Sequence, residues 1–271
     1  MKLQITGNDI KQQNIDPNIQ LHTTNDGIEL NVNAHFHTSQ PLIISYNDAL
    51  SGVLPTIRIN LEAGSKLSLI ELFKTPTSIN RHSHVTVGKD AELYAQTFAL
   101  NTGDVDLTTK VHLNSSGAFA NVETIAVTTD VEEHNIDVAV INAAPHTKGN
   151  IVNYGIVKNE AKLTFKGMGH VSRGNKNADA QQETRILSLS KTAQANAHPF
   201  LLIDEGEITA GHAAAIGQLD EEQIYYLMSR GMSKGDASQL IVSGFLNQFV
   251  DKVEIEEIKE GILQLIDDKL K

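Results

Sequence analysis

The sequence predicts a mainly β fold, in which a solenoid of stacked coils is followed by a small C-terminal α-helical domain. Residues 19–190 are dense in short segments that alternate apolar and polar side chains, as half-buried strands do. Similar windows recur along this region. From about residue 219 the apolar spacing becomes helical, and helix-start residues appear. We therefore expect a β domain over residues 1–215 and a helical domain over residues 216–271.

The repeat in the β region favours a solenoid. Four windows share an apolar residue, five polar or small residues and a second apolar residue. The second apolar residues are Leu67, Leu93, Phe119 and Leu163, which lie 26, 26 and 44 positions apart. If 44 represents two turns of 22, about seven or eight coils fit in this region, each burying its inward face against its neighbours. An antiparallel sandwich shares most of these local features and is the alternative.

Composition excludes several classes of function. The 271 residues carry 22 Lys and Arg against 33 Asp and Glu, a formal net charge of −11, which argues against nucleic acid or an anionic membrane as partner. No apolar run approaches the ~18 residues of a membrane span, and the N-terminus lacks the features of a signal peptide. We therefore expect a cytoplasmic protein. Without any cysteine, the chain offers no thiolate nucleophile or thiolate metal ligand.

No enzyme signature is present. The sequence lacks a phosphate-binding P-loop, a dinucleotide-binding glycine motif, a His-Glu-x-x-His zinc motif and a Gly-x-Ser-x-Gly nucleophile motif. We therefore expect a chain that is not an enzyme. A polysaccharide-active β-helix enzyme, the least favoured alternative, would need a cluster of Asp, Arg or Lys along one solenoid face.

Two pairs of histidines, His35/His37 and His82/His84, fall at spacing i, i+2 on expected strands. Residues two apart share a face of a strand, so each pair could grip a metal ion. No carboxylate or third histidine recurs at a supporting spacing. We therefore interpret these side chains as surface or turn histidines.

The first C-terminal helix has a full set of end residues. Asp220 is the expected N-cap, and Gln223 three residues later completes a capping box. Arg230 complements the negative helix end, and Gly231 suits the left-handed position that follows a helix. The apolar residues do not form one narrow stripe, so we expect both sides of this helix to be covered.

Two further helices are expected, one starting at Ser233 with Asp236 at its third position and one from about Ile255 to Lys269. Three helices of this size enclose little core. They either pack on the end of the solenoid or offer an apolar face to a partner, and the pattern leaves both open.

The stretch from Gln181 to Met232 resembles the SufB/SufD family of iron–sulfur cluster assembly scaffolds. The segments that carry the resemblance are Gln181-Gln182, Arg185–Ser190, His198–Glu205, Gly211-His212-Ala213, Gly217, Leu219-Asp220 and Tyr226–Gly231. Pro145–Asn150 is similar to a further family segment, and the clear match covers about 145–253. Because no cysteine lies near His212, the chain looks like the SufD branch.

The resemblance implies a right-handed parallel β-helix with a C-terminal helical domain. It also implies a non-enzymatic subunit of a SufBCD-type complex, which pairs with a SufB-like scaffold and recruits a SufC-like ATPase. Family members usually carry a helical region before the β-helix. Strand-like sequence begins here by about residue 19, so we expect that region to be missing.

Site residues follow from the same resemblance. His212 is a candidate ligand for iron or a transient cluster shared with SufB, which would supply the sulfur ligands; the chain alone should hold no cofactor tightly. Some family members have a cysteine two residues earlier, where this chain has Ala210. The alternative is that His212 is a packed interface residue.

Tyr226, Arg230 and Gly231 are the candidate residues for docking the ATPase, whereas local capping is the alternative role for Arg230. The isolated chain should form a homodimer. A purely structural homodimer without a cluster role is the alternative function.

Overall fold

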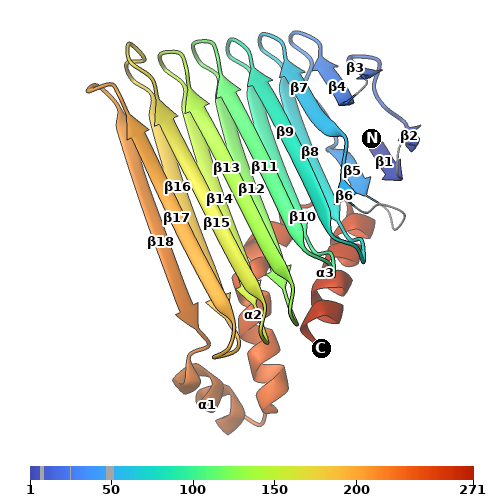
Figure 1. Ribbon diagram of the computed structural model, residues 1–271, viewed down its shortest axis with the longest axis vertical. Helices are drawn as coiled ribbons and strands as arrows, with labels where there is room; N and C mark the ends of the chain where they lie inside the picture. The colour runs from blue at the N-terminus through green and yellow to red at the C-terminus, as the bar shows by residue number, and fades with distance from the viewer. Residues whose placement is uncertain (7–8, 25, 47–51) are drawn as a thin grey trace.

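The protein is a two-sheeted solenoid with helices on one face, as the computed structural model shows for residues 1–6, 9–24, 26–46 and 52–271 (Figure 1). The sheet that carries the helices, the covered sheet, has the spatial order β18-β16-β14-β12-β10-β8-β5-β1-β2. The opposite sheet, the bare sheet, has the order β17-β15-β13-β11-β9-β7-β4-β3, with β6 beside β9.

The strands lengthen along the chain. The covered sheet contains β1 (Lys2–Thr6), β2 (Asp9–Gln13), β5 (Leu42–Tyr46), β8 (Lys66–Phe73), β10 (Glu92–Ala99), β12 (Phe119–Thr128), β14 (Lys148–Val157), β16 (Asp179–Ser188) and β18 (Thr209–Gln218). The bare sheet contains β3 (Ile19–Thr23), β4 (Gly27–Val32), β6 (Gly52–Val53), β7 (Thr56–Leu61), β9 (Ile79–Val87), β11 (Val105–Leu113), β13 (Glu133–Asn142), β15 (Lys162–Val171) and β17 (Gln194–Ile203).

The solenoid prediction is confirmed, and the antiparallel sandwich is wrong. From β7 onward the chain alternates between the sheets, and each strand pairs in parallel with the strand two places later. Among the described strands, only β1–β2 and β3–β4 pair antiparallel.

The predicted coil length of 22–26 residues is too short. Leu67 pairs with Leu93, an offset of 26, but Asp179 pairs with Thr209, an offset of 30, and Lys162 with Gln194, an offset of 32. Leu163 lies in the bare sheet and does not stack on Phe119 of the covered sheet. The coils lengthen because later strands have ten residues, so two windows that look alike in sequence belong to opposite sheets.

The main core lies between the two sheets, and it contains one buried ion pair. Leucine, isoleucine and valine from the inward positions of both sheets fill most of this space. Within it, the Arg81 guanidinium lies 2.7 Å from the Glu71 carboxylate. The Tyr46 hydroxyl donates to Glu71 at 3.0 Å, and Arg81 donates to the Thr109 hydroxyl at 2.9 Å. A buried pair with these extra hydrogen bonds fixes how the first coils stack.

Turns at the coil ends use residues that tolerate a left-handed backbone. Asp130 and Asn159 have φ of 59° and 62°, and the Asn159 amide donates to the Asp130 carboxylate at 2.9 Å. His35 also has a positive φ, and the His37 ring contacts the Gly64 carbonyl at 3.0 Å. The prediction of turn histidines is confirmed for this pair.

Three helices follow the last strand: α1 (Glu221–Ser229), α2 (Lys234–Val250) and α3 (Glu256–Leu270). The Asp220 carboxylate caps α1 by accepting from Glu222 N at 2.9 Å, and the Ser233 hydroxyl caps α2 by accepting from Asp236 N at 3.1 Å. Gly231 has φ +95°, as the position after α1 requires. The predicted helix starts and the C-terminal glycine are therefore confirmed.

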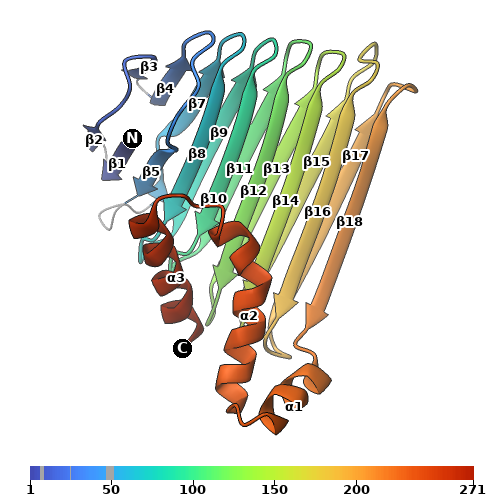
Figure 2. The ribbon, with the colours of Figure 1, turned by 180° about the vertical axis from the view of Figure 1, so that it is seen from behind.

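The helices do not pack on the end of the solenoid. α2 and α3 lie across the outer face of the covered sheet (Figure 2), where Leu246, Phe249 and Ile262 join a second core with Phe98 and Ile125. The C-terminal halves of β12 and β14 are buried on both faces, as strands covered on both sides are. None of the described helices has the length and apolar character to cross a membrane.

Candidate partner-binding surfaces

The last coil, made of β17 and β18, has a neighbouring coil on one side only. β17 pairs with β15 and β18 pairs with β16, and the described strands include no partner for their other edges. Both strands are ten residues long. Their free backbone groups form a template to which a strand of another chain can add. We call this surface the open end.

The backbone of His212 faces the free edge of β18. Thr209 N donates to the carbonyl of Ala178, the residue just before β16, at 2.9 Å. Successive residues of a strand direct their backbone groups to opposite neighbours. Residues 209, 211 and 213 therefore bond to β16, whereas His212 and Ala214 direct theirs outward. His212 brings both an imidazole and a pair of backbone groups to the open end.

The His212 side chain is exposed and stands beside Gln182, its register partner in β16. Gln182 is buried and reaches across the interior to donate to the Phe200 carbonyl at 2.7 Å. A groove of about 470 Å³ at this edge is lined by His212, Gln181 and Glu183 among others. In the described part of the chain, no three His, Cys, Asp or Glu side chains are grouped to hold a metal ion.

The predicted docking residues meet at the C-terminal end of α1. The Arg230 guanidinium lies 5.3 Å from the centre of the Tyr226 ring, and Tyr226 is 56% exposed. Gly231 N donates to the Met228 carbonyl at 2.9 Å, and Met232 N to the Leu227 carbonyl at 3.3 Å. This pair of bonds ends the helix as a Schellman motif and holds Arg230 at the C-cap.

The expectation that both sides of α1 are covered is wrong. Only Ile224 of this helix is buried, whereas Tyr225 is 74% and Met228 44% exposed. α1 and the first turns of α2 project beyond the lower ends of the strands (Figure 2), so no sheet lies over them. Leu240 of α2 is also exposed. The sequence analysis did not identify Tyr225, Met228 and Leu240 as exposed apolar residues. The available indication was that the apolar positions of the first helix are scattered around it and do not form one stripe. We call α1 and the first half of α2 the platform.

Aromatic packing and an ion pair fix the second half of α2 to the covered sheet. The Tyr154 ring lies 5.0 Å from that of Phe245 and 4.5 Å from that of Phe249. Just after α2, the Lys252 ammonium lies 2.6 Å from the buried carboxylate of Glu123. The platform is therefore fixed to the covered sheet at its C-terminal end and joined to β18 through Leu219 and Asp220 at its N-terminal end.

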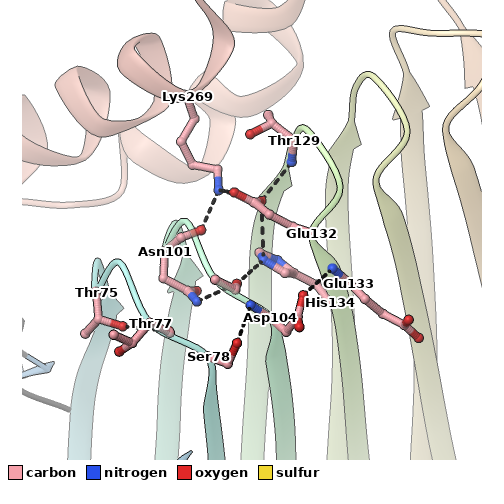
Figure 3. Close-up of polar contacts among 11 residues, drawn as sticks. Thr75, Thr77, Ser78, Asn101, Asp104, Thr129, Glu132, Glu133, His134 and Lys269 are labelled. Atoms are coloured by element: carbon pink, nitrogen blue, oxygen red, sulfur yellow. Dashed lines mark hydrogen bonds and ion pairs between the residues drawn. The ribbon is translucent and has the colours of Figure 1, made fainter. Parts of the chain in front are cut away.

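A buried polar cluster fixes the end of α3 (Figure 3). The Lys269 ammonium lies 2.8 Å from the Glu132 carboxylate and donates to the Asn101 carbonyl. Glu132 also accepts from Thr129 N at 2.8 Å. The His134 ring lies 3.2 Å from the Gly103 carbonyl. Residues from two successive turns of the solenoid thus meet one side chain of the last helix.

Burial sets the charge balance of this cluster. It raises the pKa of Glu132 and lowers the pKa of Lys269, although their mutual hydrogen bond acts against both shifts. Burial, with a smaller contribution from the Lys269 charge, lowers the pKa of His134 from 6.5 to about 3. His134 is therefore neutral near pH 7. Because Lys269 is held by groups from two turns of the solenoid, this cluster joins the end of α3 to the solenoid.

The fold and its two exposed surfaces define a parallel β-solenoid protein with a C-terminal helical platform. Residues 28–245 match the model of the SufBD core domain of the SUF system for FeS cluster assembly, and the chain belongs to this family. The resemblance stated from the sequence is therefore confirmed.

Curated relatives point to the SufD branch. The chain is 30% identical to the iron–sulfur cluster assembly protein SufD of Bacillus subtilis over 93% of its own length and 60% of the relative's. It is 26% identical to SufD of Escherichia coli over 90% of its length and 57% of the relative's. A SufBD family protein of Mycobacterium tuberculosis is 29% identical over 69% of this chain and 49% of that protein. The chain thus spans about 60% or less of the length of these relatives.

Proposed function

We propose that this chain acts in iron–sulfur cluster assembly as a SufD-like scaffold subunit without enzymatic activity of its own. It pairs with a SufB-like scaffold through the open end and docks a SufC-like ATPase through the platform. The observation that carries the proposal is the free edge of each of the ten-residue strands β17 and β18, the second of which carries His212. Family membership and the SufD relatives support the same assignment.

The isolated chain could form a homodimer through the same open end. Without a sister scaffold, a second copy can meet the same edge, so we expect a homodimer that gives way to the heterodimer when the SufB-like chain is present. Sedimentation of the chain with and without that partner tests this exchange. A dimer that persists unchanged beside the partner would favour the purely structural homodimer.

Co-expression with SufB-like and SufC-like chains tests the two surfaces against each other. Ala214→Pro removes an N–H that faces the free edge and leaves the bonds to β16 in place. We expect it to abolish co-purification of the SufB-like chain and to preserve that of the ATPase. Tyr226→Ala should do the reverse, weakening ATPase binding by about tenfold or more, since buried interface tyrosines often contribute that much.

Ala214→Val, which keeps the N–H, is the matched control for the proline. If Ala214→Pro left the SufB-like chain bound, pairing through β18 would be wrong. If Tyr226→Ala left the ATPase bound as tightly as before, the platform would not be its docking surface.

His212 is proposed to ligate iron or a nascent cluster whose sulfur ligands come from the SufB-like partner. Imidazole is a suitable ligand for iron beside thiolates. We expect His212→Ala to lower the iron and sulfide bound per complex while the complex still assembles. His198→Ala, an exposed histidine on β17, is the control. Unchanged iron and sulfide in the His212 variant would leave this residue with a packing role only.

A further inference from the structure

The outer face of the bare sheet changes from polar to apolar toward the open end. Along one line of register partners from β9 to β17, the side chains are His84, Lys110, Ala139, Met168 and Phe200. Their chain neighbours Val85, Val111 and Val140 face the core and are buried, so this line points away from it. No helix lies over this face (Figure 1). The largest apolar side chain of the line therefore stands on the strand with the free edge.

Two large apolar side chains are exposed on the outer face of β17. Phe200 is 50% and Leu202 is 49% exposed, and residues two apart on a strand share a face. Polar groups border them: His198 lies on one side, and on the other the His170 ring lies 3.3 Å from the Asp204 carboxylate. Apolar side chains inside a polar rim are typical of a protein-binding surface.

Pro199 makes the free edge of β17 different from that of β18. Gln194 N donates to the Ala161 carbonyl and Asp204 N to the Val171 carbonyl, both at 2.9 Å. The even-numbered residues of β17 therefore bond to β15, and the odd-numbered residues face the free edge. Pro199 is one of these and has no N–H to offer there. β18 contains no proline, so its free edge keeps every N–H.

The two strands of the open end thus offer different kinds of contact. β18 has an uninterrupted backbone edge and mostly small side chains, whereas β17 has an interrupted edge and two large apolar side chains. Met168, one strand inward, has neighbouring strands on both sides and is only half exposed. Phe200 lacks the strand that would cover it in the same way.

We propose that Phe200 and Leu202 anchor the solenoid that joins the open end, by packing against apolar side chains on the outer face of its last coil. The inference rests on the open-end pairing proposed above. The position of the patch supports this occupant, because the patch is continuous with the free edge and the same register line is polar farther inward. Side chains on the same face of paired strands lie about 5 Å apart, so an added strand brings its own side chains into contact with Phe200. In the isolated chain, a second copy supplies them.

Sedimentation of the isolated chain tests the anchor through the homodimer expected above. Phe200→Gln should weaken dimerisation about tenfold or more, since truncating an aromatic residue at an interface often has an effect of that size. Leu202→Gln should weaken it severalfold. Val131→Gln is the matched control, because Val131 is an apolar residue that is 80% exposed between β12 and β13, away from the open end. We expect it to change the affinity less than about twofold. If the isolated chain sediments as a monomer, binding to the SufB-like chain is compared for the same variants.

Ala214→Pro separates this inference from the proposed function. If Ala214→Pro abolishes association while Phe200→Gln and Leu202→Gln associate like the parent, the open end pairs but the anchor is wrong. If none of these three variants weakens association, both proposals are wrong. Equal losses in Phe200→Gln and Val131→Gln would show a response to surface apolarity alone and would also overturn the anchor. If Phe200→Gln fails to fold by circular dichroism, Leu202→Gln carries the test.

Discussion

The two ends of the solenoid are finished in different ways. At one end, the edge strands β2 and β3 have five residues each and turn back antiparallel on β1 and β4. Exposed Lys11, Gln12 and Gln13 lie along β2. Short strands with polar or charged side chains discourage pairing with another sheet. We call this the guarded end.

The open end lacks the short antiparallel edge strands and the polar or charged side chains of the guarded end. β18 is ten residues long, parallel and rich in alanine and glycine, and it exposes Ile216. β14, of the same length and two strands inward, is largely buried. The difference lies in having neighbours on one side or on both. The side chains of β18 are therefore exposed because, among the described strands, β18 has a neighbour at one edge only.

The largest effect should come from the interior near the guarded end. Arg81→Met leaves the buried Glu71 carboxylate without its partner, and we expect the free energy of unfolding to fall by about 3–5 kcal/mol. Urea denaturation measures it. Replacing both residues, as Glu71→Leu with Arg81→Met, should restore much of the loss. A single variant as stable as the parent would show that the pair does not hold these coils.

A matched pair of isoleucines measures the contrast between interior and open end directly. Ile186 of β16 and Ile216 of β18 are register partners, but their exposures are 2% and 51%. We expect Ile186→Ala to lower the free energy of unfolding by about 3 kcal/mol and Ile216→Ala by less than about 1 kcal/mol. Equal losses in the isolated chain would mean that the open end is already covered, as in a stable homodimer.

The effect that is smallest at neutral pH, and grows only as the pH falls, comes from an interior coil. Because the pKa of His134 is about 3 in the folded chain and near 6.5 when unfolded, the unfolded chain binds a proton that the folded chain does not. Stability should therefore fall as the pH falls through this window, by up to about 1.4 kcal/mol per pH unit. The raised pKa of Glu132 acts in the opposite direction.

His134→Gln isolates the histidine's part of this dependence. Chemical denaturation between about pH 4 and about pH 7 should give a flatter profile for the variant than for the parent. Identical profiles would show that His134 does not set the acid response.

Local features were predictable from the sequence, and features that depend on register were not. Asp220, Ser233 and Gly231 were identified because a cap needs only residues three or four apart. The repeated windows predicted the solenoid, but Leu163 could not be assigned to a sheet without the coil length. Packing of the helices on the outer sheet face was not among the alternatives, because Ile125 and Val127 look like any apolar run and their outward direction appears only in the folded sheet.

Side-chain contacts between different strands could not be predicted from the sequence either. Glu71 and Arg81 lie ten positions apart but on opposite sheets, and nothing in either segment marks them as partners. Arg58, His84 and Lys110 are spaced by 26 and 26 residues, and only the parallel register shows that they lie side by side on neighbouring strands. At the candidate site, His212 was found by resemblance, whereas the outward direction of its backbone required the hydrogen-bond pattern.

The unequal finish of the two ends limits how far these molecules can assemble. Head-to-tail growth into a fibre requires that each end accept the other, again and again. Here one end has two ten-residue strands with a free edge and the other has short, polar edge strands, so the proposed edge-to-edge association would use up its own growth site. The pairing proposed above would therefore stop at two solenoids joined open end to open end, around a two-fold or near two-fold axis.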